Sequence, residues 1–257
     1  MTPTDTPVVT SLIAADDMRR AAALYRRVFG YQDPSHSVNP RLLISLAHNG
    51  GSVVGAHAGG ELVAFAYGFA AVDDDLLYHY SQAAVVDSRY QGHGLGRALK
   101  QAQREVAIAH RQHRMRWSYD PALTRNAHFN LDVLGAVGRW FHADLYGPPG
   151  TDRIVVDWDL DDEQRDRHAP PAASAPPAAR AGGPAGWFRR CPDGADVWVP
   201  VPEDLTAAAE RLGRTTLDVR HELARVISEL MADGYVAVSC QRLGGMLAAY
   251  RFVRETS

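Results

Sequence analysis

The stretch that decides the fold runs from position 85 to 97 and reads VVDSRYQGHGLGR. Two valines enter a glycine-rich turn, and apolar residues at helical spacing follow from Leu95. Glycine permits positive φ angles and lets a ligand approach the backbone closely. A helix that begins directly after such a turn offers unpaired backbone N–H groups and the positive end of its dipole. This combination predicts a site for a pyrophosphate group.

The spacing of the glycines narrows the choice of nucleotide. A P-loop needs a Gly-Lys-Ser/Thr end, which is absent, and the dinucleotide fingerprint needs a third glycine where this chain has Arg97 or Leu99. The pattern Gln/Arg-x-x-Gly-x-Gly/Ala does fit, through Gln91, Gly94 and Gly96. Residues 87–116 also carry seven basic and two acidic residues, so we expect a locally positive surface around the turn.

Apolar periodicity predicts alternating helices and strands on both sides of this stretch. We expect strands at 8–12, 52–57, 61–69, 76–86, 115–119, 137–145 and 153–160, and helices at 16–29, 40–48, 95–110 and 125–134. Such an order predicts an α/β (α+β) fold with a central mixed sheet flanked by helices.

A Pro/Ala-rich segment interrupts the chain at 168–186 and contains five prolines but no bulky apolar residue. It predicts an extended linker between a domain at 1–167 and a small α+β module at 187–257. In the module we expect a strand at 197–201, helices at 204–212 and 218–231, and a hairpin of 235–240 with 246–253. Pro200 inside the first of these strands predicts an edge strand or a loop.

Composition excludes several classes of protein. The chain has 257 residues, is 46% hydrophobic and carries a net charge of −3, which argues against a strongly basic nucleic-acid binder. No apolar run approaches the roughly 18 residues that a membrane helix needs. Two cysteines cannot form a disulfide framework, and no His/Cys/carboxylate cluster predicts a metal site. We therefore expect a soluble, cytoplasmic protein without nucleic-acid or membrane partners.

The residues from Gln91 to Gly96, with the strand before and the helix after them, resemble the coenzyme A loop of the GCN5-related N-acetyltransferase (GNAT) superfamily. The expected element order over residues 6–160 is similar to the fold of that superfamily. Asp120-Pro121, Leu134-Gly135-Ala136 and Asp152-Arg153 further resemble a poorly characterised branch with an extra C-terminal segment. The resemblance implies a mostly antiparallel sheet and acetyl-CoA or another acyl-CoA, such as a succinyl or longer donor, as co-substrate, with no metal.

The resemblance also assigns site residues. It implies that the backbone around Ala84, Val85 and Val86 polarises the thioester carbonyl, and that the loop holds the pyrophosphate. The residues expected to bind the cofactor in addition to these three are Gln91, Gly92, His93, Gly94, Leu95, Gly96, Arg97, Asn126 and Phe129.

The proton-transfer groups are less well defined. Many members of the superfamily carry a Tyr seven residues after the Asn, and it protonates the leaving thiolate; here that position is Val133. Tyr119 and His128 are the candidate substitutes. For removal of the acceptor's proton, the candidates are His79 and Tyr80 on the strand at 76–86, although His79 could instead simply pack against a helix.

The expected function is an acyl-CoA-dependent N-acyltransferase that acts by direct attack on the amine of a small molecule or amino-acid-like acceptor. The alternative is a non-catalytic acyl-CoA-binding module that regulates a partner. A homodimer is left open. In the C-terminal module, Leu223, Val226, Ile227 and Leu230 form an apolar helical stripe that must cover something, either as a lid over the acceptor or as a structural buttress.

Overall fold

A computed structural model describes residues 7–33, 36–161, 175–180 and 183–255. The chain divides into two compact units: Met1–Trp117 with Asp159–Asp161, and Ser118–Trp158 with Asp162–Ser257. This division differs from the expected boundary at the Pro/Ala-rich linker, much of which lies outside the described residues. We describe each unit by itself.

The first unit is a sheet with the strand order β1-β2-β3-β4-β5. Neighbours are antiparallel except β4 and β5, which are parallel. The strands are β1 (Val9–Ser11), β2 (Ser52–Ala58), β3 (Glu61–Asp73), β4 (Leu76–Val86) and β5 (Arg114–Tyr119), whose last two residues belong to the second unit. The helices are α1 (Ala15–Phe29), α2 (Pro40–His48), the 3-10 helix η2 (Ser88–Tyr90) and α3 (Leu95–Ala109).

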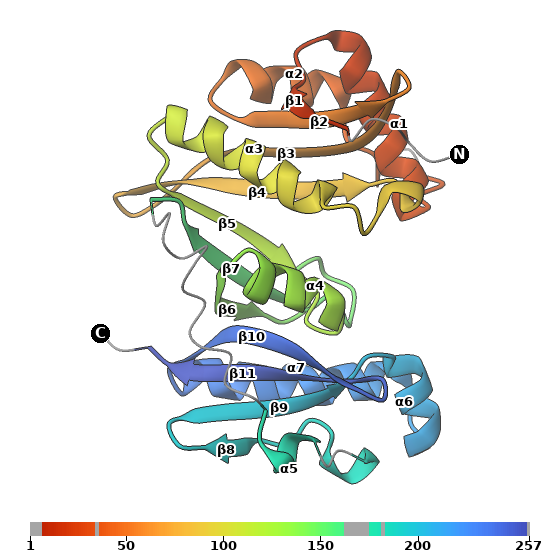
Figure 1. The fold of residues 1–257 in the computed structure, drawn as a ribbon, viewed down its shortest axis with the longest axis vertical. Coiled ribbons are helices and arrows are strands. Elements are labelled where there is room, and N and C mark those ends of the chain that lie inside the picture. Colours follow the sequence, from red (N-terminus) through yellow and green to blue (C-terminus); the bar gives the residue numbers. More distant parts are fainter. Residues whose placement is uncertain (1–6, 34–35, 162–174, 181–182, 256–257) are drawn as a thin grey trace. The chain divides into compact units, whose positions relative to one another are not determined.

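Helices cover both faces of this sheet (Figure 1). On one face, Met18 and Leu24 of α1 and Leu43 of α2 pack with Phe65 of β3. On the other face, Leu95 and Leu99 of α3 pack against small and branched side chains of β2 and β3, including Val54, Ala56, Val63, Ala64 and Ala66. The small side chains let α3 lie close to the strands, which brings the start of α3 next to the end of β4.

Strand β4 is irregular near its middle. Its pairing with β3 shifts between Tyr67↔Ala83 and Gly68↔Ser81, so Gln82 is an extra residue that bulges out of the ladder. Its pairing with β5 is confined to His79↔Met115 and Tyr80↔Arg116, although β4 continues to Val86. Within the described part of the first unit, the β5-facing edge of β4 is therefore open beyond Tyr80.

The second unit is an antiparallel sheet with the order β7-β6-β10-β11-β9-β8. Its strands are β6 (Val137–His142), β7 (Arg153–Asp159), β8 (Cys191–Asp193), β9 (Asp196–Pro202), β10 (Tyr235–Gly244) and β11 (Leu247–Arg254). Its helices are α4 (Thr124–His128), the π-helix η3 (Phe129–Val133), α5 (Pro177–Arg180), η4 (Pro184–Gly186), α6 (Leu205–Leu212) and α7 (Thr216–Ala232). Among the strand pairs described above, only β4 and β5 are parallel, so the expected mixed, mostly antiparallel sheet flanked by helices is confirmed.

The C-terminal segment extends the sheet of β6 and β7. Strand β10 pairs with β6 at Ala237↔Gly138, and α7 packs against both of these strands. The apolar stripe that the sequence predicts on α7 is buried, with Ile227 and Leu230 at 0% exposure. A capping box between Thr215 and Asp218 begins the helix. The stripe therefore covers the sheet of its own unit.

The expectation for the strand that contains Pro200 was wrong. Strand β9 lies between β11 and β8 and is not an edge strand. Its pairing with β8 ends at Trp198, and the carbonyl of Pro200 accepts a hydrogen bond from Phe188 N on that side. Because N–H and C=O groups of one strand residue point to the same side, the missing N–H of Pro200 falls where β8 has already ended.

Candidate functional site

The glycine turn between β4 and α3 has the geometry of an anion site. Gly92 and Gly94 have φ angles of 82° and 81°, a region that other residues rarely adopt, and Gly94 is the N-cap of α3. A Cβ atom at either position would meet no heavy atom within 4 Å, so this side of the turn is open. The amide of Ala98 bonds to the Gly94 carbonyl, and the amides of Leu95 and Gly96 precede it in the first turn of α3, where a helix leaves its N–H groups available to a ligand.

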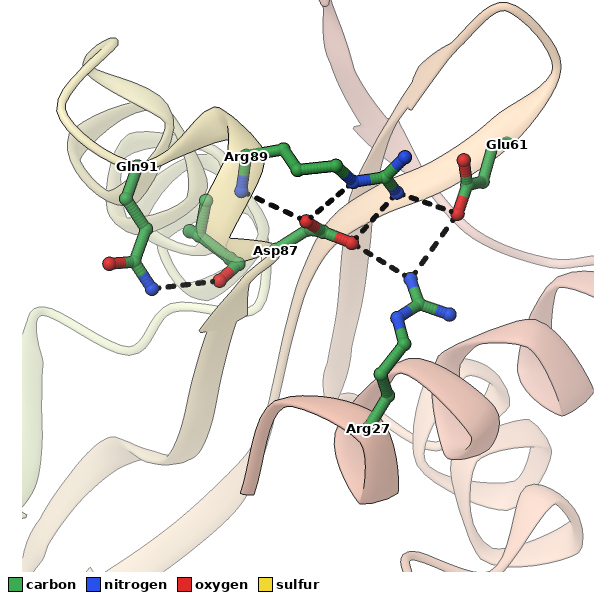
Figure 2. Close-up of polar contacts among 6 residues, drawn as sticks. Arg27, Glu61, Asp87, Arg89 and Gln91 are labelled. Atoms are coloured by element: carbon green, nitrogen blue, oxygen red, sulfur yellow. Dashed lines mark hydrogen bonds and ion pairs between the residues drawn. The ribbon is translucent and has the colours of Figure 1, made fainter. Parts of the chain in front are cut away.

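An ion-pair cluster holds the base of this turn (Figure 2). The buried carboxylate of Asp87 accepts bonds from the backbone and Nε of Arg89, both at 3.0 Å, and from Nη2 of Arg89 and of Arg27, both at 2.9 Å. Both guanidinium groups also contact Oε1 of Glu61, at 3.0 and 3.3 Å. The bonds from Arg89 hold the pKa of Asp87 well below its usual range. The cluster thereby ties η2 to α1 and β3.

The side-chain amide of Gln91 also holds the base of the turn, because its Nε2 donates to the carbonyl of Val86 at 3.1 Å (Figure 2). A hollow of about 410 Å³ lies beside the cluster, lined by Arg27, Val28, Glu61, Asp87, Ser88, Arg89 and Gln91. Sequence reasoning missed Arg27 and Glu61, which lie far from the turn in the sequence. The Asp-x-Arg spacing of Asp87 and Arg89 is a local pattern typical of a turn, and it could have identified these two residues.

The expected positive surface is not what the structure shows. Five of the basic residues at 87–116 contact partners within the first unit: Arg89 contacts Asp87, Lys100 contacts Ser81, Arg104 contacts the Leu160 carbonyl, Arg114 contacts Asp159 and Arg116 contacts Asp73. Attraction of an anion to the turn therefore rests on the backbone N–H groups at the start of α3 more than on a cluster of charges.

The open edge of β4 presents backbone donors. The amide of Asp87 bonds to Val63 O on β3, so by strand alternation the N–H groups of Val86 and Ala84 point away from β3, while those of Val85 point toward it. Ala84 is exposed and Val85 is buried in the core. The sequence-predicted residues Ala84, Val85 and Val86 are thus continuous with the glycine turn, and two of their three N–H groups face the open edge.

His79 and Tyr80 lie on opposite faces of β4. His79 is fully buried, its Nε2 lies 2.8 Å from Ser52 Oγ, and its Nδ1 lies 2.7 Å from Gln112 Oε1. Burial lowers its pKa to about 4. Tyr80 is half-buried, with its ring 5.5 Å from that of Phe69. The placement of His79 favours a structural role, because a base that acts through water needs a ring nitrogen that water can reach.

The remaining predicted residues belong to the second unit. Asn126 is exposed in the first turn of α4, and Phe129 is half-buried at the start of η3. Tyr119 is buried, and burial raises its pKa well above the ordinary value. The helix expected at 125–134 is interrupted, because the Leu134 amide bonds to Phe129 O in a π-helical turn. Such turns occur often at functional sites.

His128 has a defined environment at the junction of α4 and η3. Its Nδ1 lies 3.0 Å from Asp132 Oδ2 and 3.0 Å from the carbonyl of Cys240. Asp132 also accepts bonds from Ser239 Oγ at 2.5 Å and from Cys240 N at 2.8 Å. The bond to Asp132 raises the pKa of His128. Both acceptors need a proton on Nδ1, so the network fixes the imidazole's orientation and favours its protonated form.

No group of three or more His, Cys, Asp or Glu side chains in residues 7–33, 36–161, 175–180 and 183–255 could hold a metal ion. Over the same ranges, no helix combines the length and the apolar character needed to cross a bilayer.

Comparisons with known proteins agree with this geometry. The family model described as acetyltransferase (GNAT) family matches residues 15–130, which include β4, the glycine turn, α3 and α4. A comparison with curated protein sequences gives no significant match.

One solved structure shares the fold: yncA, a candidate acetyltransferase from Salmonella typhimurium solved with its cofactor acetyl-CoA, at 16% identity and a TM-score of 0.50 over 67% of this chain and 100% of that one. Two others have TM-scores of 0.48 over 60% of this chain. They are a candidate GNAT acetyltransferase from Desulfovibrio desulfuricans (14% identity, 99% of that chain) and the ribosomal-protein-S18-alanine N-acetyltransferase from Escherichia coli (17%, 94%). Residues 15–130, which include the glycine turn and its flanking elements, thus match the GNAT acetyltransferase family, and this match supports acyl-CoA-dependent acyl transfer.

Proposed function

We propose that the protein is an N-acyltransferase that moves an acyl group, acetyl by default, from coenzyme A to the amine of a small molecule or amino-acid-like acceptor. One observation carries the proposal. The open edge of β4 runs directly into a glycine turn at the start of α3, so donors for a thioester carbonyl and for a pyrophosphate lie on one continuous piece of chain. A nucleotide-linked thioester needs both sets of donors at once.

The donor is held by backbone groups in this proposal. The amides of Leu95, Gly96 and Arg97 bind the pyrophosphate, with Arg97 adding a charge, and the loop residues Gly92, His93 and Gly94 wrap around it. The N–H groups of Ala84 and Val86 face the pantetheine arm and the thioester. Asn126 and Phe129 belong to the second unit, and their contacts with coenzyme A stay predictions of the family resemblance.

The reaction is a direct acyl transfer. The neutral amine attacks the thioester carbon, and a β4 N–H stabilises the oxyanion that develops on the carbonyl oxygen. The C–S bond then breaks, the nitrogen loses a proton and the thiolate gains one. For the acceptor's proton we retain Tyr80 as the residue that orients water. For the thiolate, the candidates Tyr119 and His128 belong to the second unit, so their role stays a prediction of the sequence; the raised pKa of His128 suits proton donation better than that of Tyr119, which burial raises well above its ordinary value.

A regulatory acyl-CoA-binding module is the second candidate function. The observations that favour it are Val133 at the position of the usual proton donor and the burial of His79. Release of free CoA from acetyl-CoA and from succinyl-CoA, measured with a panel of amines and with mass spectrometry of the products, separates the two functions. Acylation of any amine supports the transferase. Tight donor binding without turnover across the panel would instead support the regulatory module.

A further inference from the structure

A continuous chain of buried polar side chains crosses the first unit, and the proposed reaction uses none of it directly. It connects α3, β4 and β2 with the loop that precedes β5. Its members are between 0% and 3% exposed: Lys100, Ser81, Gln103, Ser52, His79 and Gln112. Lys100 is also the only lysine of the chain.

The hydrogen bonds of this buried chain run in one direction. Lys100 Nζ donates to Ser81 Oγ at 2.7 Å, and Ser81 Oγ donates to Gln103 Oε1 at 2.8 Å. Gln103 Nε2 then donates to Ser52 Oγ at 3.0 Å. The Ser52 hydroxyl is left to donate to His79 Nε2 at 2.8 Å. Each of these side-chain oxygens thereby accepts a hydrogen bond, and the sequence of donors and acceptors determines where the protons lie.

That arrangement fixes the state of His79. Because Nε2 accepts from Ser52, the ring proton lies on Nδ1 and is donated to Gln112 Oε1 at 2.7 Å, while Gln112 Nε2 donates to the Gly50 carbonyl at 3.2 Å. The imidazole is therefore neutral. The carboxamides of Gln103 and Gln112 also interrupt any proton relay, since an amide does not pass protons as a hydroxyl does. These hydrogen-bonded side chains are therefore suited to fixing the positions of the segments that carry them, and not to transferring protons.

The position that it holds is the bulge of β4. Ser81 directly precedes the extra residue Gln82, and it pairs with Gly68 on β3. A Cβ atom on Gly68 would lie 2.5 Å from His79 Nε2 and 2.5 Å from the Tyr80 carbonyl, so the ring fills the space that this glycine leaves. The bulge is thus packed from β3 and hydrogen-bonded from α3.

Lys100 sits where the two parts of the donor site meet. It lies on the second turn of α3, the helix whose first turn forms the proposed pyrophosphate site, and its Nζ bonds to β4 just before the open edge. The same Nζ lies 3.7 Å from the ring centre of Trp117 on β5. Burial of an amine is unfavourable, and burial lowers the pKa of Lys100 well below its ordinary value. An apolar side chain of similar length would fill this space at lower free energy, so stability alone does not account for a lysine here.

We propose that Lys100 and Ser81 are positioning residues for acyl transfer: their bond fixes the start of α3 relative to the bulge of β4. A donor anchored by its pyrophosphate on α3 then has its thioester carbonyl at the β4 N–H groups. This inference rests on the proposed function of the same site. A misplacement of the carbonyl by about 1 Å can lower turnover by about 100-fold without loss of the anchored part of the donor.

The test compares variants at the two ends of the buried chain. Lys100→Met and the double variant Lys100→Met/Ser81→Ala remove the bond between α3 and β4; the double variant leaves neither partner of that bond unpaired, although Gln103 Oε1 loses its donor Ser81. Gln112→Met is the matched control, because it removes a buried polar partner of His79 at the other end. The readouts are calorimetric affinities for CoA and acetyl-CoA and the infrared carbonyl band of bound, carbonyl-labelled acetyl-CoA.

We expect both Lys100 variants to bind CoA within about twofold of the wild type, to lose most of the shift of the carbonyl band and, with any accepted amine, to lose about 10- to 100-fold in kcat. The Gln112→Met variant should retain both. A folded Lys100 variant with the wild-type band shift and kcat overturns the inference, as does an equal loss of the band shift in Gln112→Met. If Lys100→Met does not fold, the double variant decides. Failure of the wild type to bind CoA would instead overturn the proposed function, and this inference with it.

Discussion

At the scale of single residues, two titratable side chains of the first unit are held in opposite states by their surroundings. Asp87 is buried among the guanidinium groups of Arg27 and Arg89, which favour its charged form. His79 is buried away from water, and this loss of hydration favours its neutral form even though the bond to Gln112 opposes it. Both act on the same stretch of chain, since one holds the end of β4 and the other its bulge.

The neutral state of His79 predicts a dependence of stability on pH. Its pKa falls from 6.5 in the unfolded chain to about 4 in the folded one, so between these values the unfolded state binds more protons. Stability contributed by His79 is therefore complete above about pH 6.5 and is lost as the pH falls toward 4. From pH 7 to pH 5 the loss is about 2 kcal/mol. Urea unfolding of the wild type and of His79→Gln at both pH values measures it, and equal losses in the two proteins would argue against this assignment.

The face on which His79 lies could be predicted from the sequence, but its role could not. Strand alternation places His79 and Ser81 on one face of β4 and Tyr80 on the other, as the structure has them. Nothing local says that α3 covers that face with Lys100 and Gln103. A histidine that faces an open cleft and one in a buried network produce the same alternation of residues along a strand. The role of His79 can therefore be assigned only when the packing of α3 is known.

At the scale of elements, the segments with strong periodicity could be predicted well. Strand β4 has the expected bounds, Leu76–Val86, and α3 ends one residue earlier than expected, at Ala109. The failures occur where bonds to distant segments decide. The helix expected at 125–134 changes to a π-helical turn at Phe129, where Asp132 is bonded to Ser239 and Cys240 of β10. No residue pattern within 125–134 encodes those partners.

The junction of α4 and η3 leads to a prediction on catalysis. If His128 protonates the thiolate, kcat must fall as the pH rises through its pKa, and the bond to Asp132 moves that fall to higher pH. We expect Asp132→Asn to shift the alkaline limb of the kcat profile to lower pH, and His128→Gln to lower kcat by about 100-fold and to remove the limb. The profiles are measured with any amine that the wild type acylates. An unchanged limb in His128→Gln would assign the proton donor elsewhere.

At the scale of the whole molecule, the C-terminal segment is part of a folding unit that begins before the linker. Arg220 of α7 contacts Asp120 at 2.6 Å, and Tyr250 of β11 donates to the Pro121 carbonyl at 2.8 Å. Both contacts involve the Asp120-Pro121 motif, which precedes the linker in the sequence. The packing of α7 on β6 and β10 supports the structural-buttress alternative, and the linker composition alone could not predict it because it says nothing of which strands pair across it.

This packing predicts a contrast between two positions of α7. Ile227 is fully buried, so Ile227→Ala should lower the free energy of unfolding by about 2–5 kcal/mol. Leu217 on the same helix is 39% exposed, and Leu217→Ala should cost less than about 1 kcal/mol. Thermal and urea unfolding measure both. Equal stability of the two variants would mean that α7 does not cover the sheet as described.

The central claim is that the turn from Gly92 to Gly96 binds the pyrophosphate of coenzyme A, and one pair of variants at Gly94 tests it most directly. Asn and Asp have nearly the same shape and both tolerate the left-handed backbone, and a side chain there points into open space. Only the Asp variant places a negative charge beside the anion. We expect calorimetry to show CoA binding by the wild type, weaker binding by Gly94→Asn, and a further loss of at least about tenfold in Gly94→Asp at low salt that diminishes as salt is added. Equal CoA affinity in the two variants would contradict a pyrophosphate site at this turn.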